Sequence, residues 1–202
     1  MRSARPAVFL GRDSVFHDAR GELRRPEDLA WPTGAAHALR ALRRAGWLLV
    51  LVSNQPGIAR GLFGPAAYDN LVSALHADLA RHGAALDSVY HCPHLPDAPL
   101  AAWRCQCACR LPAPGLLRRA ARDLDIDLQA SLMLGEQPRD IQAGRTAGLA
   151  ACILVGTDTG QAAPGDGEPG VGVGVGAGAD ANCADLAQAA HWVLEHAGRL
   201  HA

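Results

Sequence analysis

The chain has 202 residues, of which 49% are hydrophobic, and a formal net charge of −1. This length and composition predict one globular domain with a sizeable core. The small net charge excludes a broad basic surface for nucleic acid, and an aromatic content of 4% argues against a platform for base stacking. No run approaches the roughly 20 apolar residues of a membrane span, and the apolar run at residues 7–10 is too short for a signal peptide. We therefore expect a cytoplasmic protein with no nucleic-acid or membrane partner.

Short apolar runs alternate with amphipathic stretches from residue 7 to residue 155. The runs predict strands at Val8–Leu10, Trp47–Val52, Asp87–His91, Ser131–Leu134 and Ala151–Val155. The amphipathic stretches predict helices at Ala35–Ala45, Pro65–His82, Pro114–Leu124 and Pro138–Ala147. This alternation predicts an α/β protein with a Rossmann-like parallel sheet and helices on both faces. Because ligands bind beyond the carboxyl ends of such strands, the loops at residues 11–14, 53–57 and 135–140 should converge on one site.

A glycine-rich segment interrupts this alternation after the fifth strand. Residues 160–181 contain alternating glycine and valine and are expected to form a flexible surface excursion. We therefore divide the chain into a main part at residues 1–159, the excursion at 160–181, and a C-terminal part of the same domain at 182–202. The last apolar segment, residues 190–196, fits either an edge strand or the end of a helix.

Two pairs of metal-binding residues flank a proline-containing loop. Cys92 and His94 form the first pair, and Cys107 and Cys109 form the second. Three cysteines and one histidine are a common ligand set of structural Zn²⁺, and a loop between two close pairs can close them into a tetrahedron. The loop has no periodic apolar face, so bound metal would supply its stability. We predict a structural zinc loop at residues 92–109.

Two further residues offer alternative ligands for this zinc. Cys105 could replace Cys107, because Cys105, Cys107 and Cys109 alternate along the same stretch. His91 adjoins Cys92 and could also serve. Disulfides are disfavoured in the reducing compartment that we expect.

The motifs together resemble a known family of phosphatases. They are Ser53-Asn54-Gln55-Pro56-Gly57-Ile58-Ala59-Arg60-Gly61, Cys92-Pro93-His94, the stretch at residues 109–115, and the stretch at residues 133–140. The chain is similar over residues 7–155 to the D-glycero-D-manno-heptose 1,7-bisphosphate 7-phosphatases of the haloacid dehalogenase superfamily. Histidinol-phosphate phosphatases share the pattern. The resemblance implies the haloacid dehalogenase fold and a phosphorylated sugar as ligand.

The resemblance also implies roles for individual residues. Asp13 corresponds to the general acid and base of the family. Ser53, together with the backbone of Asn54, corresponds to the group that holds the phosphoryl oxygens, and Arg110 corresponds to an arginine that recognises the substrate. The arginine's planar fork suits a phosphate. Cys92, His94, Cys107 and Cys109 correspond to the zinc ligands.

Magnesium is the second metal that the resemblance implies. Asp13, Glu136 and Asp140 occupy the positions from which the family binds Mg²⁺. Glu136 stands where the family has an aspartate, and its extra methylene can misplace an ion whose ligands lie at about 2.1 Å.

Two other departures concern the phosphoryl group itself. Gly11 stands where the family has the aspartate that attacks phosphorus, and a glycine has no nucleophile to offer. Leu111 stands where the family has a phosphate-binding lysine, and the chain contains no lysine at all. Together these changes keep the local charge near balance, which indicates that the site changed as a unit.

Three functions follow as hypotheses. The first is a phosphatase homologue with lost or greatly reduced hydrolysis that still binds a phosphorylated sugar. The second is a working sugar-phosphate phosphatase in which Asp13 activates water directly. The third is a non-catalytic interaction module built on the zinc loop and the glycine-rich excursion. The resemblance favours a monomer.

Overall fold

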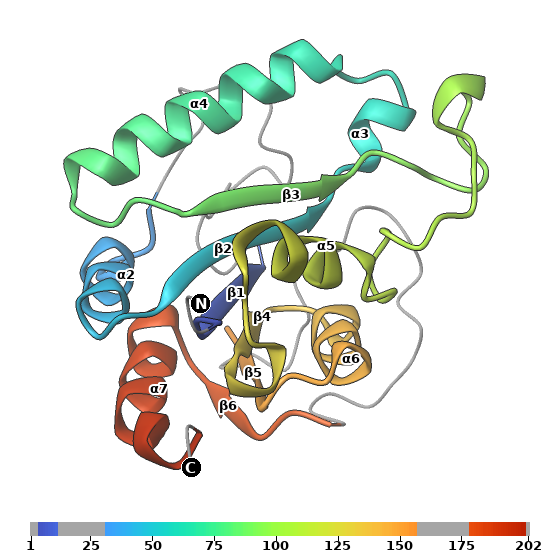
Figure 1. Cartoon of the computed structure of the whole chain (residues 1–202). Helices are drawn as coiled ribbons and strands as arrows, with labels where there is room; N and C mark the ends of the chain where they lie inside the picture. The colour runs from blue at the N-terminus through green and yellow to red at the C-terminus, as the bar shows by residue number, and fades with distance from the viewer. Residues whose placement is uncertain (1–3, 12–30, 157–177, 201–202) are drawn as a thin grey trace.

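The computed structural model describes residues 4–11, 31–156 and 178–200. Within these residues the chain forms a six-stranded, wholly parallel sheet in the order β3-β2-β1-β4-β5-β6 (Figure 1). β1 is central, between β2 and β4. The parallel α/β architecture predicted from the alternating pattern is therefore confirmed.

The strands lie close to the predicted runs. They are β1 (Ala7–Gly11), β2 (Leu48–Asn54), β3 (Ser88–Cys92), β4 (Leu132–Gly135), β5 (Ala151–Val155) and β6 (Ala181–Cys183). β6 was not predicted, because three residues carry no periodic pattern. The bulk of the glycine-rich excursion and the loop that contains Asp13 lie outside the described residues.

The helices confirm the four that the amphipathic stretches predict and add others. The longer ones are α2 (Ala35–Arg44), α4 (Pro65–Arg81), α5 (Gly115–Leu124), α6 (Pro138–Ala147) and α7 (Leu186–Leu200), and the short ones are α3 (Pro56–Ala59), η2 (Ala101–Trp103) and η3 (Leu128–Ala130). The last apolar segment is therefore a helix rather than an edge strand. Leu186, Ala189, Ala190 and Val193 recur at helical spacing and are buried.

Helices cover both faces of the sheet and enclose two cores (Figure 1). On one face, side chains of α2, α4 and α7 pack against Val8 and Leu10 of β1. On the other face, side chains of α5 and α6 pack against Phe9 of the same strand. Strands buried on both faces read as unbroken apolar runs, which explains why the sequence predicted them. No helix in the described ranges has the length and apolar character that a membrane crossing requires.

Candidate functional site

The carboxyl ends of four neighbouring strands bring the predicted site residues to one edge of the sheet. Gly11 ends β1 and pairs with Val52, one residue before Ser53 of β2. Asn54 ends β2 and pairs with Cys92, which ends β3. Gly135 ends β4, on the other side of β1. Strands of a parallel sheet converge in this way because all their carboxyl ends point in one direction.

Gly11 lies at the centre of this edge. It is buried and is the last residue of β1, which is paired on both sides. No side chain projects from this position toward the site. Asp13 lies outside the described residues, so its predicted role stays a prediction.

Ser53 is buried, and polar groups hold its hydroxyl. The side-chain amide of Gln55 donates to Ser53 Oγ at 3.1 Å, and the hydroxyl of Tyr68 lies 3.5 Å away. Tyr68 comes from α4, and its ring packs against the ring of His91 at a centroid distance of 4.3 Å. Neither Gln55 nor Tyr68 was predicted as a site residue. Gln55 lies inside the recognised motif, whereas no local pattern marks Tyr68.

The Asn54 side chain faces protein backbone. Its Nδ2 donates to the carbonyl of Leu111 at 3.0 Å, and its Oδ1 accepts from the amide of Leu111 at 2.9 Å. Both hydrogen bonds are buried. The predicted phosphate-holding role of Asn54 concerns its backbone and stays a prediction, while its side chain is bonded to the backbone of another loop.

Leu111 occupies the position at which the resemblance implies a lysine, and its side chain is part of the core. It is 3% exposed and belongs to the cluster beneath α5, which also contains Leu116 and Leu117. Cys107 and Cys109 pack against the same cluster. Leu111 thus joins the zinc loop to the core of the domain.

Arg110 precedes Leu111 and is half-buried. Its Nη1 donates to the carbonyl oxygen of His94 at 3.1 Å. This bond ties the guanidinium to the first pair of predicted zinc ligands. The side chain of the predicted substrate-recognition arginine is therefore fixed by a hydrogen bond to the zinc loop.

The loop after β4 brings Asp140 against the end of that strand. Asp140 is buried in the first turn of α6, and its Oδ2 accepts from the backbone amide of Gln137 at 3.1 Å. The backbone of Asp140 in turn bonds to the Gln137 side chain, which completes a capping box. Glu136, in the same loop, is half-buried. Two of the three predicted magnesium ligands therefore lie on the short segment from the end of β4 into the first turn of α6, and the third, Asp13, is outside the described residues.

The four predicted zinc ligands converge on one point. Their donor atoms all lie within 4.8 Å of one another. Cys109 Sγ lies 3.2 Å from Cys107 Sγ, 3.3 Å from Cys92 Sγ and 3.5 Å from His94 Nδ1. A tetrahedral zinc ion holds such donors about 3.5–3.8 Å apart, since its bonds to sulfur and nitrogen are about 2.3 and 2.0 Å. Cys92 Sγ lies 3.5 Å from Cys107 Sγ and 3.7 Å from His94 Nδ1, and the two shorter sulfur–sulfur distances to Cys109 lie slightly below this range. The donor set and its geometry fit a structural metal ion.

The protonation of the three thiols is mutually dependent. Burial raises the pKa of Cys92, and the hydrogen bond with Cys109 raises it further. Burial acts in the same direction on Cys107, but hydrogen bonds from Cys109 and Cys92 outweigh it and lower the pKa of Cys107. A metal ion favours the deprotonated form of all three, since thiolate is the form that ligates.

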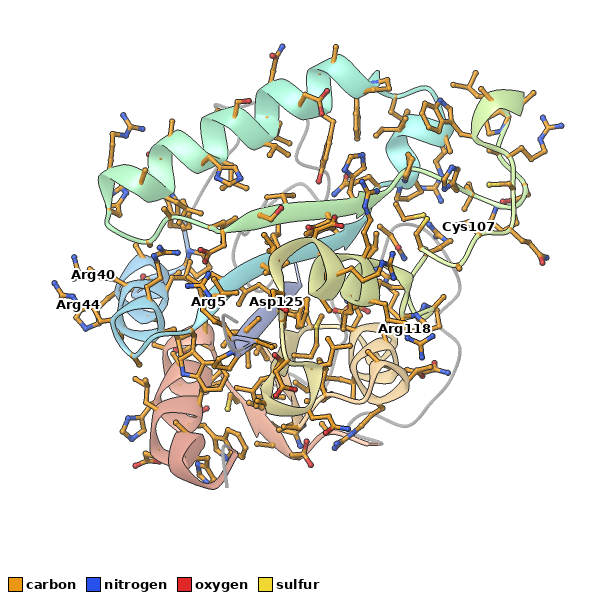
Figure 2. All side chains as sticks on the ribbon, in the orientation of Figure 1. Arg5, Arg40, Arg44, Cys107, Arg118 and Asp125 are labelled. Carbon is orange, nitrogen blue, oxygen red and sulfur yellow. The ribbon has the colours of Figure 1, made fainter. Side chains whose placement is uncertain are left out.

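Neither alternative zinc ligand belongs to this group. Cys105 is exposed, and the four-donor cluster does not contain it. His91 instead packs on Tyr68. Figure 2 shows Cys107 on the extended segment that projects beyond β3, at the side of the molecule where β2 and β3 end.

The architecture and this site edge define a hydrolase of the haloacid dehalogenase class. A family model described as HAD-hydrolase-like matches residues 108–197. A crystal structure of D,D-heptose 1,7-bisphosphate phosphatase from B. bronchiseptica, complexed with magnesium and phosphate, is similar with a TM-score of 0.75 and 34% identity. The similarity covers 95% of this chain and 99% of that one.

Sequence relatives narrow the class to one family. D-glycero-beta-D-manno-heptose-1,7-bisphosphate 7-phosphatase from Photorhabdus laumondii is 40% identical over 152 residues, which cover 75% of this chain and 81% of the relative. The Yersinia pestis phosphatase of the same name is 38% identical over 168 residues, covering 83% and 88%. The chain therefore belongs to the D-glycero-D-manno-heptose 1,7-bisphosphate 7-phosphatase family, as the motifs predicted.

Proposed function

We propose that this protein binds a phosphorylated sugar at the carboxyl edge of its sheet and has lost, or greatly reduced, the hydrolysis that its family performs. The observation that carries the proposal is the position of Gly11. This residue ends the central strand, where a nucleophilic carboxylate would face the phosphoryl group, and it has no side chain. Removing a nucleophile from an enzyme has cost on the order of 10⁴–10⁶ in rate.

The burial of Leu111 supports the same proposal. A lysine at this position could place a cation beside the phosphoryl oxygens, but the leucine side chain is buried in the core beneath α5. A lost charge-stabilising group typically costs about 10²-fold or more in rate. Binding relies on other groups, namely the hydroxyl of Ser53 and the guanidinium of Arg110.

The protein would use two metals, Zn²⁺ for structure and Mg²⁺ at the phosphoryl group. Zn²⁺ would be held by Cys92, His94, Cys107 and Cys109, and it would order the loop that carries Arg110. Mg²⁺, when bound near Glu136 and Asp140, would neutralise charge on the phosphoryl group. We propose a cytoplasmic location, which the six free cysteines support, because disulfides are rare in reducing compartments.

The test measures binding and turnover on the same preparation. Heptose 1,7-bisphosphate and Mg²⁺ are supplied to the zinc-loaded protein, and released phosphate is followed beside a family member that has aspartate at position 11. The proposal expects saturable binding with turnover at least about 10³-fold below that relative, given the cost of a missing nucleophile. Comparable turnover would overturn it.

The names of the relatives favour a second candidate, a working phosphatase. In this case water attacks phosphorus directly, and Asp13 serves as general base. Asp13→Asn should then abolish the activity that wild type shows. An Asp13→Asn variant as active as wild type would exclude this candidate.

A further inference from the structure

The side-chain amide of Asn54 connects two segments that are far apart in sequence. Its donor and its acceptor both bond to the backbone of Leu111, at 3.0 and 2.9 Å, across 57 positions of the chain. Asn54 ends β2, whereas Leu111 follows the second pair of zinc-loop cysteines. A reciprocal pair of this kind fixes orientation as well as distance, because both bonds must be made at once.

Arg110 lies between this pair and a second anchor. Its backbone is continuous with the amide of Leu111 that Asn54 accepts from, and its guanidinium donates to the carbonyl of His94 at 3.1 Å. The segment of His94 is itself fixed to the sheet, since the backbone amide of Gln55 donates to the carbonyl of Cys92 at 2.8 Å. The backbone of Arg110 and its guanidinium are therefore both connected, through these hydrogen bonds, to the end of β2.

We propose that Asn54 is a positioning residue that acts on the phosphorylated ligand through Arg110. The side chain of Asn54 holds the backbone of Leu111 against β2. It thereby fixes the position from which the guanidinium of Arg110 binds a phosphate. This inference rests on the proposed function, since it concerns the same ligand. It gives the side chain a role of its own, beside the contact with the phosphoryl oxygens that the resemblance implies for the Asn54 backbone.

The chemistry of the amide favours this assignment. A phosphoryl group accepts hydrogen bonds, so it needs donors; the side-chain oxygen of Asn54 cannot donate, and the side-chain nitrogen already gives one of its two N–H groups to the carbonyl of Leu111. That oxygen instead takes the amide proton of Leu111. Shortening Asn54 to alanine would leave a buried amide and a buried carbonyl of Leu111 without these partners, which frees the loop rather than merely removing one ligand contact.

A double-mutant cycle distinguishes the two roles. Dissociation constants for inorganic phosphate are measured for wild type, Asn54→Ala, Arg110→Ala and the double variant, all zinc-loaded. If Asn54 acts through Arg110, each single variant weakens binding about tenfold and the double variant stays within about twofold of Arg110→Ala. If the two losses multiply to about 100-fold, Asn54 contacts phosphate itself and the proposal is overturned. Asn182→Ala, at an exposed position of β6, is the matched control and should bind like wild type.

A second measurement needs no ligand. In ¹⁵N-labelled protein the Nε–Hε resonance of Arg110 and the exchange rate of the Leu111 amide are compared between wild type and variants. We expect Asn54→Ala to shift the arginine resonance toward that of a solvated side chain and to speed exchange at Leu111 at least about tenfold. Unchanged values in a folded variant would overturn the proposal.

The two arms also separate this inference from the proposed function. If wild type binds no phosphate, the proposed function fails, while the Arg110 and Leu111 signals still decide what Asn54 does. If Asn54→Ala does not fold, Asn54→Asp replaces it. The aspartate keeps an acceptor for the Leu111 amide but opposes a second acceptor to the Leu111 carbonyl, so we expect a shift in the same direction.

Discussion

Asp140 packs directly against the backbone of Gly135. A Cβ atom added to Gly135 would lie 2.4 Å from Asp140 Cβ and 2.9 Å from its Oδ2. The end of β4 and the first turn of α6 approach this closely because position 135 has no side chain. The contact places the Asp140 carboxylate at the site edge, where it also accepts from the amide of Gln137.

Gly135→Ala should therefore displace Asp140 and destabilise the fold. Overpacking of this kind costs about 1–3 kcal/mol, which lowers the melting temperature of a chain of this size by about 2–4 °C per kcal/mol. Differential scanning calorimetry measures the change. Gly64→Ala is the control, because an added Cβ there meets nothing within 4 Å. A Gly135→Ala variant as stable as this control would contradict the close packing.

The zinc loop offers a matched pair of cysteines. Cys107 lies in the four-donor group, whereas Cys105, two residues earlier, is exposed and outside it. Cys107→Ser should lose most of the bound zinc and melt at a lower temperature, because metal binding supplies stability to this loop. Cys105→Ser should keep both zinc and stability.

Metal analysis and thermal melting of the purified variants check this prediction. A strong chelator added to wild type should lower its melting temperature toward that of Cys107→Ser, and should change Cys107→Ser itself little. Equal zinc contents in the two serine variants would show that the ligand set is different. Loss of zinc from Cys105→Ser alone would restore the alternative in which Cys105 is a ligand.

The fold was predictable from the sequence where burial alone determines the pattern. β2 reads as an unbroken apolar run because both of its faces are covered by helices. β6 was not predictable, because its position depends on a distant pairing. The amide of Cys152 donates to Asp180 Oδ2 at 2.7 Å, and the amide of Asp180 donates to the carbonyl of Cys152 at 2.8 Å. These bonds hold the returning chain beside β5.

In the site, too, local motifs could be predicted, whereas contacts between distant segments could not. The zinc ligands were predictable, because two close pairs of soft donors suffice to propose a tetrahedral metal site. The roles of Asn54 and Leu111 were not, since neither the reciprocal hydrogen bonds nor the inward direction of the leucine side chain is encoded locally. The resemblance assigned the Asn54 backbone to the ligand and no role to its side chain, which faces the backbone of another loop.

Cys152 and Cys105 should differ sharply in their reaction with alkylating agents. Burial raises the pKa of Cys152 to about 11, although Arg145 acts in the opposite direction, and the side chain has no exposed surface. At pH 8 the thiolate fraction of such a group is only about 10⁻³, and the thiolate is the reactive form. Cys105 is exposed on the zinc loop and is therefore accessible to the alkylating agent.

Mass spectrometry after brief treatment with iodoacetamide measures this difference. At pH 8 we expect label on Cys105 and none on Cys152 in the folded, zinc-loaded protein. The thiolate fraction of Cys152 rises with pH through about 11, so labelling should increase in that direction as long as the fold persists. Label on Cys152 at pH 8, at a rate near that of Cys105, would contradict its burial.

Restoring a carboxylate at position 11 tests whether the site has lost only its chemistry. Gly11 ends β1 between β2 and β4, so an aspartate there would enter the edge where the phosphoryl group is proposed to bind. We expect Gly11→Asp to raise phosphate release from heptose 1,7-bisphosphate by about 10²-fold or more, since a missing nucleophile costs on the order of 10⁴–10⁶ in rate. Gly11→Asn, which has the same size but is no nucleophile, is the matched control and should stay at the wild-type rate.

Adding Leu111→Lys to Gly11→Asp should bring a gain in rate only at a cost in stability. The leucine side chain is 3% exposed in the core beneath α5, and an unpaired ammonium group cannot remain there. The lysine must turn toward the site and leave a cavity, and losing a buried leucine side chain costs about 2–5 kcal/mol. We therefore expect the double variant to melt below Gly11→Asp even if it turns over faster. A double variant of unchanged stability would show that position 111 can face the site without loss to the core.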